Sequence, residues 1–339
     1  MGNQTDKPQP IDKLRDGAGS LEIRTPDDDS AISKLISTGD RLLVVKGKGI
    51  YEIKLADQVD PERTNIATPN TIQRVIPYGA DAPWVGAVIL TAHHLFQSSC
   101  SPSEIDGVTA FALVLKMAED IAGAHQLEEN YRKAEEVVTK NLDPKIRKDR
   151  SFIVPALGNV ESRCNEFLQR ADHALQELFR LVRMFYSDVD SGGWESFKKR
   201  IDGEPQDIDN FPQFLAEVIP FLQLIRNARN CVEHPRAEQR LVVTDFRLDP
   251  KNMLLPPMIE IIHPRTPQKK VPVGVFFNQA LQNLVNAVEL MMVFLCARHV
   301  RLIGGLSVQV MELPPDRRRS EHVRYGYSAV LGDQIVPMG

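Results

Sequence analysis

The chain has 339 residues, of which 42% are hydrophobic, 25% charged and 6% aromatic. This apolar share is typical of globular proteins and excludes a fully disordered or fibrous chain. The formal net charge is -4, which excludes a global basic field. Any contact with nucleic acid must therefore come from a local patch.

Four cysteines are spread along the chain, and none belongs to a C-x-x-C pair. The spacing therefore indicates neither a zinc site nor a redox pair, and apolar surroundings predict buried thiols in a reducing compartment. Residues 1–20 contain no apolar run of the kind that directs secretion, so we expect a soluble cytoplasmic protein. Residues 275–300 form the most apolar stretch, but their Asn, Gln and Glu side chains favour a buried helix over a membrane span.

The N-terminal part is predicted to be a tail followed by strands. Residues 1–30 are rich in Gly, Pro and Asp, which is typical of a flexible tail. Two β-rich runs surround Lys46-Gly47-Lys48-Gly49, and a glycine at positive φ predicts a hairpin there, within an element over 31–82. These glycines serve a turn rather than a phosphate loop, because the frame G-x-x-x-x-G-K-[ST] is absent.

From Trp84 onward the sequence indicates helices: residues 84–99 are continuously apolar, and within 160–188 apolar residues recur at the spacing of one helix face. Long helices are predicted over 84–99, 105–142, 160–188, 211–235 and 273–302. Pro220 is expected to kink the fourth of them, and Pro235 to end it. Glycines bracket a short helix or loop between the third and the fourth.

Strands are predicted over 240–248 and 257–264, which makes residues 239–272 a β insert between the last two long helices. A C-terminal β-hairpin is predicted within 306–339, with its tip at 314–321. The expected fold class is mainly α: one helical bundle over 83–305, decorated with β-hairpins at the N-terminus, in the insert and at the C-terminus.

Most histidines indicate no specific chemistry. His93 and His94 are adjacent and thus point about 100° apart on a helix, which is poor geometry for a shared metal ion. The others outside the motif described next are isolated, and a structural role is expected for each: His125, His173, His263, His299 and His322. Neither H-E-x-x-H nor G-x-S-x-G occurs, so we expect no metal and no cofactor.

The exception is the end of the predicted helix over 211–235, which reads Arg226-Asn227-Ala228-Arg229-Asn230-Cys231-Val232-Glu233-His234. At about 100° per residue, five polar side chains share one arc of the last two turns: Arg226, Arg229, Asn230, Glu233 and His234. Arginine offers a planar fork of donors to phosphate oxygens, and histidine titrates near neutral pH. This arc therefore predicts a site that binds and processes a phosphate ester.

Arg229-Asn230-Cys231-Val232-Glu233-His234 resembles the hallmark of the HEPN superfamily, R-x(4-6)-H with Asn directly after the Arg. The place of this motif near the end of a late core helix is also similar to that family. The resemblance covers about 150 to 305 and implies a HEPN-like bundle. It further implies a metal-independent endoribonuclease, commonly a toxin or defence effector, that works as a dimer with two motifs facing each other.

The chemistry that the resemblance implies is cleavage of RNA by attack of its own 2′-OH on the adjacent phosphorus. His234 would act as general acid or base, Arg229 would stabilise the phosphoryl charge, and Asn230 would orient His234. Arg226 would support the site, while the carboxylate of Glu233 is a departure that would repel phosphate unless an arginine neutralises it. Arg229 and His234 lie about 140° apart on an ideal helix, which predicts that two chains each supply one of them.

A second interpretation belongs to another class: a non-catalytic HEPN-like interaction or regulatory module that binds a protein partner or nucleotide. Arg229 and Glu233 are spaced i, i+4 and could simply form a surface ion pair. A nuclease needs the 226–234 face open to a cleft. A scaffold would bury that face under the β insert or tie its polar groups into local pairs.

RNA is the expected partner, beside a second copy of the chain and an antitoxin or regulatory protein, with no membrane. Basic residues that could hold its backbone fall in two candidate clusters, Lys269-Lys270 and Arg317-Arg318-Arg319, and a third cluster lies within 145–150. The aromatic residues beside these clusters are few, chiefly Tyr325 and Tyr327. Single-strand binding on a stacking platform is therefore poorly supported by the sequence.

Overall fold

The computed structural model describes residues 9–17, 23–25, 28–140, 149–189, 192–204, 209–300, 308–318, 320–331 and 334–338. About 50% of the described residues are helical and 19% lie in strands, so the fold is mainly α, as predicted. The chain divides into two compact units, 1–86 and 87–339, rather than one decorated domain. The division lies near the predicted end of the N-terminal element at residue 82.

The first unit contains a four-stranded antiparallel sheet in the order β1-β2-β3-β4. Its strands are β1 (Lys34–Thr38), β2 (Arg41–Val45), β3 (Ile50–Lys54) and β4 (Thr71–Ile76), and its short helices are α1 (Pro10–Asp16), α2 (Ala56–Val59) and α3 (Pro83–Val85). Ile36, Val44 and Ile53 are among the side chains buried in it. The single hairpin predicted over 31–82 is thus the central pair of a larger sheet.

The turn at Lys46–Gly49 joins β2 to β3 as predicted, and the amide of Lys46 donates to the carbonyl of Gly49 at 2.9 Å. The predicted positive φ is wrong: among the described glycines only Gly39, Gly158 and Gly193 adopt one. The structure requires glycine at Gly47 for a different reason, since a Cβ there would lie 2.7 Å from the Asp81 carboxylate.

The described part of the predicted N-terminal tail contains α1, which ion pairs fasten to the first unit. The Arg15 side chain is only 5% exposed and lies 2.7 Å from Asp57. Arg63 reaches Asp12 at 2.8 Å and Asp57 at 2.8 Å. Ion pairs therefore hold this segment in place, and amino-acid composition alone does not show which charged residues form them.

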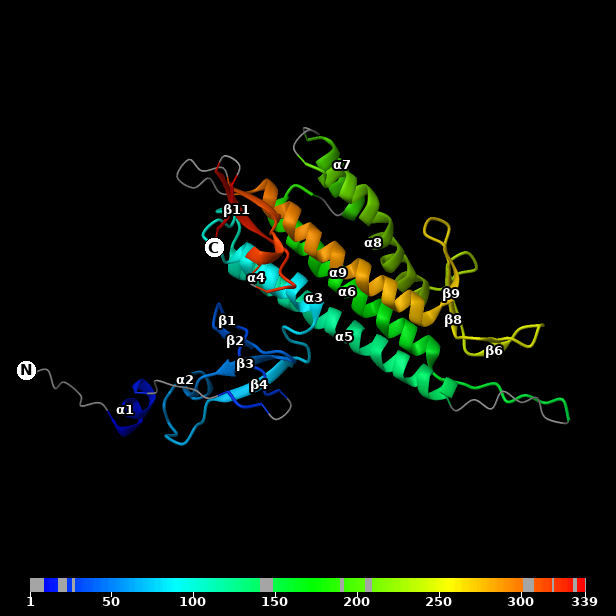
Figure 1. Ribbon diagram of the computed structural model, residues 1–339, viewed down its shortest axis with the longest axis horizontal. Helices are drawn as coiled ribbons and strands as arrows, with labels where there is room; N and C mark the ends of the chain where they lie inside the picture. Colours follow the sequence, from blue (N-terminus) through cyan, green and yellow to red (C-terminus); the bar gives the residue numbers. More distant parts are fainter. Residues whose placement is uncertain are drawn as a thin grey trace, which may run out of the picture. The chain divides into compact units, whose positions relative to one another are not determined.

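The second unit is built around four long helices, α5 (Gly107–Lys140), α6 (Val160–Phe185), α8 (Phe211–Glu233) and α9 (Val273–Arg298). They lie side by side (Figure 1), and α6 packs against the other three. Phe167 of α6 stacks on Phe277 of α9 with ring centroids 4.1 Å apart. These four helices confirm four of the five predicted long helices. The helix predicted over 84–99 is instead divided into α3, a π-helical stretch (Gly86–Leu90) and α4 (Thr91–Phe96).

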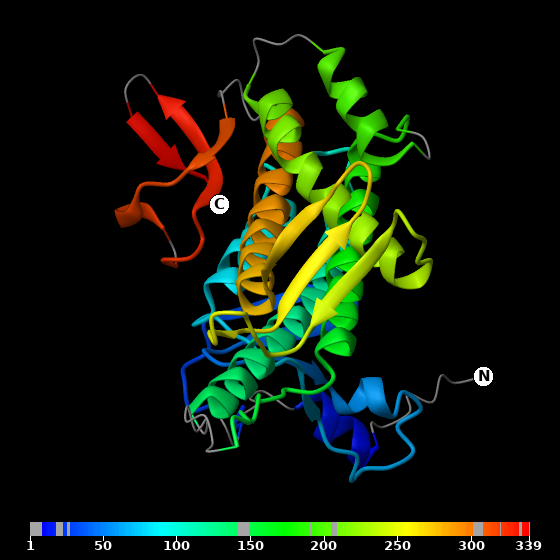
Figure 2. The same cartoon turned by 90° about the vertical axis from the view of Figure 1, so that its right-hand side faces the viewer.

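The short helix α7 (Gly193–Asp202) precedes α8, and the predicted β insert follows α8. The insert holds β5 (Arg240–Thr244), β8 (Met258–Ile262) and β9 (Gln268–Pro272) in the order β5-β8-β9, plus the small pair β6 (Arg247–Leu248) and β7 (Leu254–Leu255). Figure 2 shows this sheet, in yellow, lying across the helices. Ile259 and Ile261 are buried between the sheet and the bundle.

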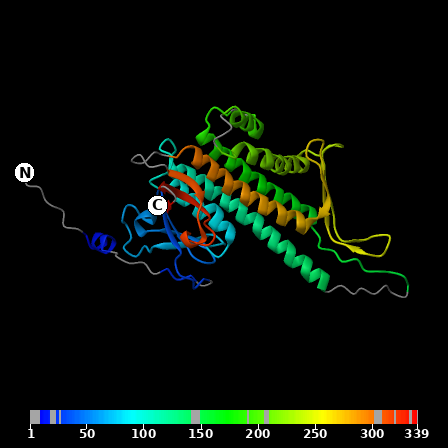
Figure 3. The ribbon, with the colours of Figure 1, turned by 45° about the horizontal axis from the view of Figure 1, so that its top comes forward.

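The C-terminal strands β10 (Val308–Glu312), β11 (Tyr325–Leu331) and β12 (Gln334–Pro337) form a three-stranded sheet rather than a hairpin, with a 3-10 turn at Pro315–Arg317. This sheet lies beside α9 and α4 (Figure 3). The Tyr327 hydroxyl donates to the Leu95 carbonyl at 2.9 Å, and Arg324 pairs with Glu289, which is completely buried on α9.

All four cysteines are free and buried, as expected. One helix, α9, is long and apolar enough to cross a membrane, but 61% of its most apolar window is buried inside the protein. That burial is typical of the core helix of a soluble protein.

Candidate anion-binding site on the motif helix

The last turns of α8 divide the predicted motif between a buried and an open side. Ala228 and Cys231 are buried towards the bundle, where the Cys231 thiol lies 3.8 Å from the Ile262 carbonyl of β8. Arg229 and Asn230 are half-buried, whereas Arg226, Glu233 and His234 are exposed. The 226–234 face is thus not covered by the β insert.

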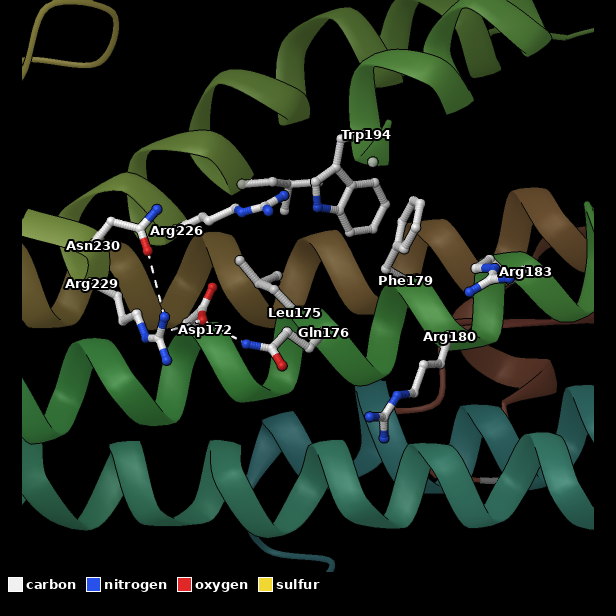
Figure 4. A pocket seen from close by; sticks show the side chains of 12 residues that line it. Asp172, Leu175, Gln176, Phe179, Arg180, Arg183, Trp194, Arg226, Arg229 and Asn230 are labelled. Atoms are coloured by element: carbon white, nitrogen blue, oxygen red, sulfur yellow. Dashed lines mark hydrogen bonds and ion pairs between the residues drawn. The ribbon is translucent and has the colours of Figure 1, made fainter. Parts of the chain in front are cut away.

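A pocket of about 460 Å³ opens between α6, α7 and α8 (Figure 4). Three of the five predicted motif side chains line it, namely Arg226, Arg229 and Asn230. Glu233 and His234 are not among its lining residues. The structure therefore brings the two arginines and the asparagine together and leaves the histidine outside.

The pocket is strongly cationic. Four arginines line it, Arg180 and Arg183 from α6 and Arg226 and Arg229 from α8, against one carboxylate, Asp172. Asp172 is only 4% exposed, and it accepts a hydrogen bond from the Gln176 amide at 2.7 Å. A low-dielectric wall with this excess of positive charge attracts anions.

Arg229 shares its guanidinium between two carboxylates. Its Nη1 lies 2.7 Å from Glu233 and its Nε 3.8 Å from Asp172. The buried Nε donates no hydrogen bond within the described residues. The ion pair that the i, i+4 spacing allowed is therefore present.

Arg226 and Arg183 both line the pocket, and neither forms an ion pair with any described residue. Arg180 pairs with Glu177 at 2.6 Å. Gly193 lies at the rim with φ of 69°, and a Cβ there would sit 3.5 Å from Nη1 of Arg226. That distance is an ordinary contact, so it is the left-handed backbone of this residue that favours glycine.

His234 is the residue at which α8 ends, with φ of -133° and ψ of 63°. Its amide donates to the Asn230 carbonyl at 2.9 Å. The Asn230 side chain, however, contacts Arg229 at 3.5 Å, and no hydrogen bond joins it to the His234 ring in the described residues. The expectation that Asn230 orients His234 is therefore wrong for the single chain, because the asparagine turns towards the arginine.

None of the described residues of the predicted basic clusters lines this pocket; Lys269 and Lys270 lie on a strand, and Arg317 and Arg318 in the connection between β10 and β11. Lys269 and Lys270 belong to β9, and Lys269 is exposed. Arg317 is exposed beside Asp316, but Arg318 is largely buried, donates to the Leu313 carbonyl and pairs with Glu312 at 3.1 Å. Arg318 therefore has a structural role. Arg319, with residues 145–148 of the third cluster, lies outside the described residues.

Sequence reasoning missed the half of the pocket that α6 and α7 supply: Asp172, Gln176, Phe179, Arg180, Arg183 and Trp194. The available signal was the polar face of α6, where Asp172, Gln176, Arg180 and Arg183 recur at helical spacing. Phe179 and Trp194 meet edge to face with centroids 4.9 Å apart. Aromatic residues thus do accompany a cationic cluster, though not the predicted ones.

Compared with protein-family profiles, with curated proteins and with solved structures, the chain gives no match. Within the part of the chain that the structure describes, no three His, Cys, Asp or Glu residues lie close enough to hold a metal ion.

Proposed function

We propose that this protein is a metal-independent endoribonuclease of HEPN type, working in the cytoplasm as a toxin or defence effector. One observation carries the proposal: Arg226, Arg229 and Asn230 of the motif line a single cationic pocket, next to an exposed His234. An enzyme that cleaves RNA needs a site for phosphate and a group that moves protons. The end of α8 offers both within two turns.

The roles within the motif shift with the geometry. Arg226, which has no ion pair with a described residue, takes the phosphate oxygens, because Arg229 is already held by Glu233 and Asp172. Arg229 then positions the asparagine and reinforces the positive field. His234 removes the proton from the 2′-OH or delivers one to the leaving 5′-oxygen. The arginines stabilise the charge that develops on the phosphoryl group.

His234 does not line the pocket of its own chain. We therefore propose a homodimer, in which the His234 of one chain reaches RNA held in the pocket of its partner. A twofold arrangement would present two equivalent sites, since the same surface meets itself across a twofold axis.

The test compares wild type, His234→Ala and Arg226→Gln on unstructured RNA and on tRNA, in EDTA, with analysis of the product ends. We expect wild type alone to cleave and to leave 2′,3′-cyclic phosphates. His173→Ala is the matched control, because His173 lies on α6 beside Asp120 and outside the pocket. A wild type that binds RNA but never cleaves it, or whose cleavage needs a metal, would contradict the proposal.

A second candidate function is a non-catalytic module that holds a nucleotide or an acidic protein partner in the same pocket. The Arg229–Glu233 pair favours it, since it ties the motif arginine into a local contact as a scaffold would. Binding that survives His234→Ala and is lost in Arg226→Gln, without cleavage by any variant, identifies this function.

A further inference from the structure

The pocket between α6, α7 and α8 has two separate cationic ends. Figure 4 shows Arg229 at one end, with Arg226 extending from that end towards Trp194, and Arg180 and Arg183 at the other end. Along α6 the pocket extends from Asp172 to Arg183, eleven residues apart, or about 16 Å at the rise of an α-helix. A single phosphate ion can occupy only one end of a site of this length.

The wall between the two ends is apolar and aromatic. Leu175 and Leu222 line it, together with the edge-to-face pair Phe179 and Trp194. Trp194 is buried to 7% exposure, so its ring is fixed by its neighbours before any ligand arrives. A planar base is the part of a nucleic acid that gains most from such a surface.

The charge at each end remains available to a ligand. Arg226 at one end and Arg183 at the other have no ion pair with a described residue, and the one lining carboxylate, Asp172, is already bonded to Gln176. Along its length the site can therefore bind a phosphate, then a base, then a second phosphate. A base within a duplex is paired and stacked, so it cannot enter the pocket.

From this pattern we propose that the pocket holds a single-stranded stretch of RNA, with two phosphates of the strand at the two arginine pairs and a base against Phe179 and Trp194. This deepens the proposed function and rests on it for the choice of RNA as ligand. The single-stranded segment is the part of the substrate that the pocket selects, whatever structure flanks it.

Trp194 reports on occupancy directly. The chain has two tryptophans, so Trp84→Phe in the full-length protein leaves emission from Trp194 alone. This variant is titrated with inorganic phosphate, a 5′-mononucleotide, a 2′-O-methyl tetranucleotide and a fully paired 2′-O-methyl duplex. The 2′-O-methyl group removes the nucleophile, so binding is measured separately from cleavage.

We expect the tetranucleotide to change Trp194 emission saturably and to bind at least about tenfold more tightly than the mononucleotide, with no saturable change from the duplex. Arg183→Gln should abolish that tenfold advantage and lower the slope of log affinity against log salt by about 0.7. Arg170→Gln is the matched control, since Arg170 lies on the same helix beside Asp120 and outside the pocket. It should change neither quantity.

Equal affinity for phosphate and tetranucleotide, duplex binding as tight as single-strand binding, or an Arg183→Gln variant that retains the full advantage would overturn the inference. If Trp84→Phe fails to fold, anisotropy of a labelled tetranucleotide on wild-type protein gives the same comparison. Single-strand binding without cleavage contradicts the ribonuclease and leaves the inference standing. Wild-type cleavage that Arg183→Gln leaves unchanged would support the ribonuclease and contradict the inference about the pocket.

Discussion

Arg229, in the candidate phosphate-binding motif, already has two carboxylates beside its guanidinium. Its Nη1 lies 2.7 Å from Glu233, whose side chain is 35% exposed, and its Nε faces the buried Asp172. An incoming phosphate would compete with both carboxylates. One turn earlier on α8, Arg226 has no ion pair with a described residue, and we expect Glu233 to limit anion binding at the end of this helix.

Glu233→Gln removes this acidic group while keeping the shape of the side chain. We expect tetranucleotide affinity to rise about threefold to tenfold, because a negative charge next to the pocket is lost. The free energy of unfolding should change by less than about 1 kcal/mol, since the ion pair is partly exposed. Titration of Trp194 emission and urea unfolding give the two values.

The control for this substitution is Glu217→Gln, which changes an exposed glutamate on the same helix, bonded to Gln213 and remote from the pocket. Weaker binding in Glu233→Gln would show that Glu233 serves to position Arg229, and would reverse the role given to it above.

The contribution of α8 to the candidate site could be predicted from residue types at helical spacing, because those residues belong to one element. The contribution of α6 could not. Arg183 and Trp194 line the same pocket as Arg226 only through the packing of three helices, and no periodicity within one segment encodes that arrangement. The direction of Asn230 was likewise decided by competition between Arg229 and His234, which spacing leaves open.

At the scale of elements, an ion pair joins the C-terminal sheet to α9. Glu289 is completely buried, and burial raises the pKa of its carboxyl above the ordinary value of 4.5 even though Arg324 lowers it. Arg324 approaches from β11 with 40% of its side chain exposed, over the ring of Tyr325. The sheet thus supplies the cation that makes a buried carboxylate on α9 tolerable.

Arg324→Leu should destabilise the protein by about 1–3 kcal/mol at pH 7.5, because Glu289 then stays charged without a partner. The penalty should shrink at pH 5. A carboxyl whose folded pKa is raised binds its proton more readily folded than unfolded, so stability is lost as the pH rises towards the raised pKa and returns on acidification. Urea unfolding at the two pH values measures the difference.

Two variants make the test specific to this pair. Arg324→Leu combined with Glu289→Gln should remove the pH dependence, since no charge remains to be buried. Arg317→Leu changes an exposed arginine of the same C-terminal region and should cost little at either pH. A penalty for Arg324→Leu that is equal at pH 5 and pH 7.5 would contradict the account.

The long helices could be predicted because 26 residues of α6, like those of α9, repeat one apolar face, and this signal grows with length. The sheets could be predicted only as pairs. The added strands are β1 and β4 in the first unit, β9 in the insert and β12 at the C-terminus, and each joins through hydrogen bonds that local sequence does not specify. At Gly47 the requirement came from Asp81, more than thirty residues away.

At the scale of the whole molecule, the proposed division of labour between two chains predicts complementation. Neither His234→Ala nor Arg226→Gln should cleave RNA alone. Mixing them in equal amounts, with time for subunits to exchange, should restore about a quarter of the wild-type activity, because half of the dimers are mixed and each holds one intact composite site.

Activity per chain should also fall when wild-type protein is diluted below its dimer dissociation constant, as followed by the size of the species in solution. A mixture that stays inactive although mixed dimers are shown to form would place Arg226 and His234 in the same site of one chain. The His234→Ala protein alone, taken through the same mixing and exchange steps, gives the background activity.

The cysteines of this chain lie in only one of its two units, and chemical labelling of thiols can detect this difference. All four cysteines lie between residues 100 and 296, each at most 1% exposed, and residues 1–86 contain none. In native buffer a thiol reagent should therefore react with none of them. In a urea series, the gain of four reactive thiols per chain should follow the opening of 87–339 alone, while the emission of Trp84, in a Trp194→Phe background, follows 1–86. The protein thus carries a separate reporter of unfolding in each of its two units.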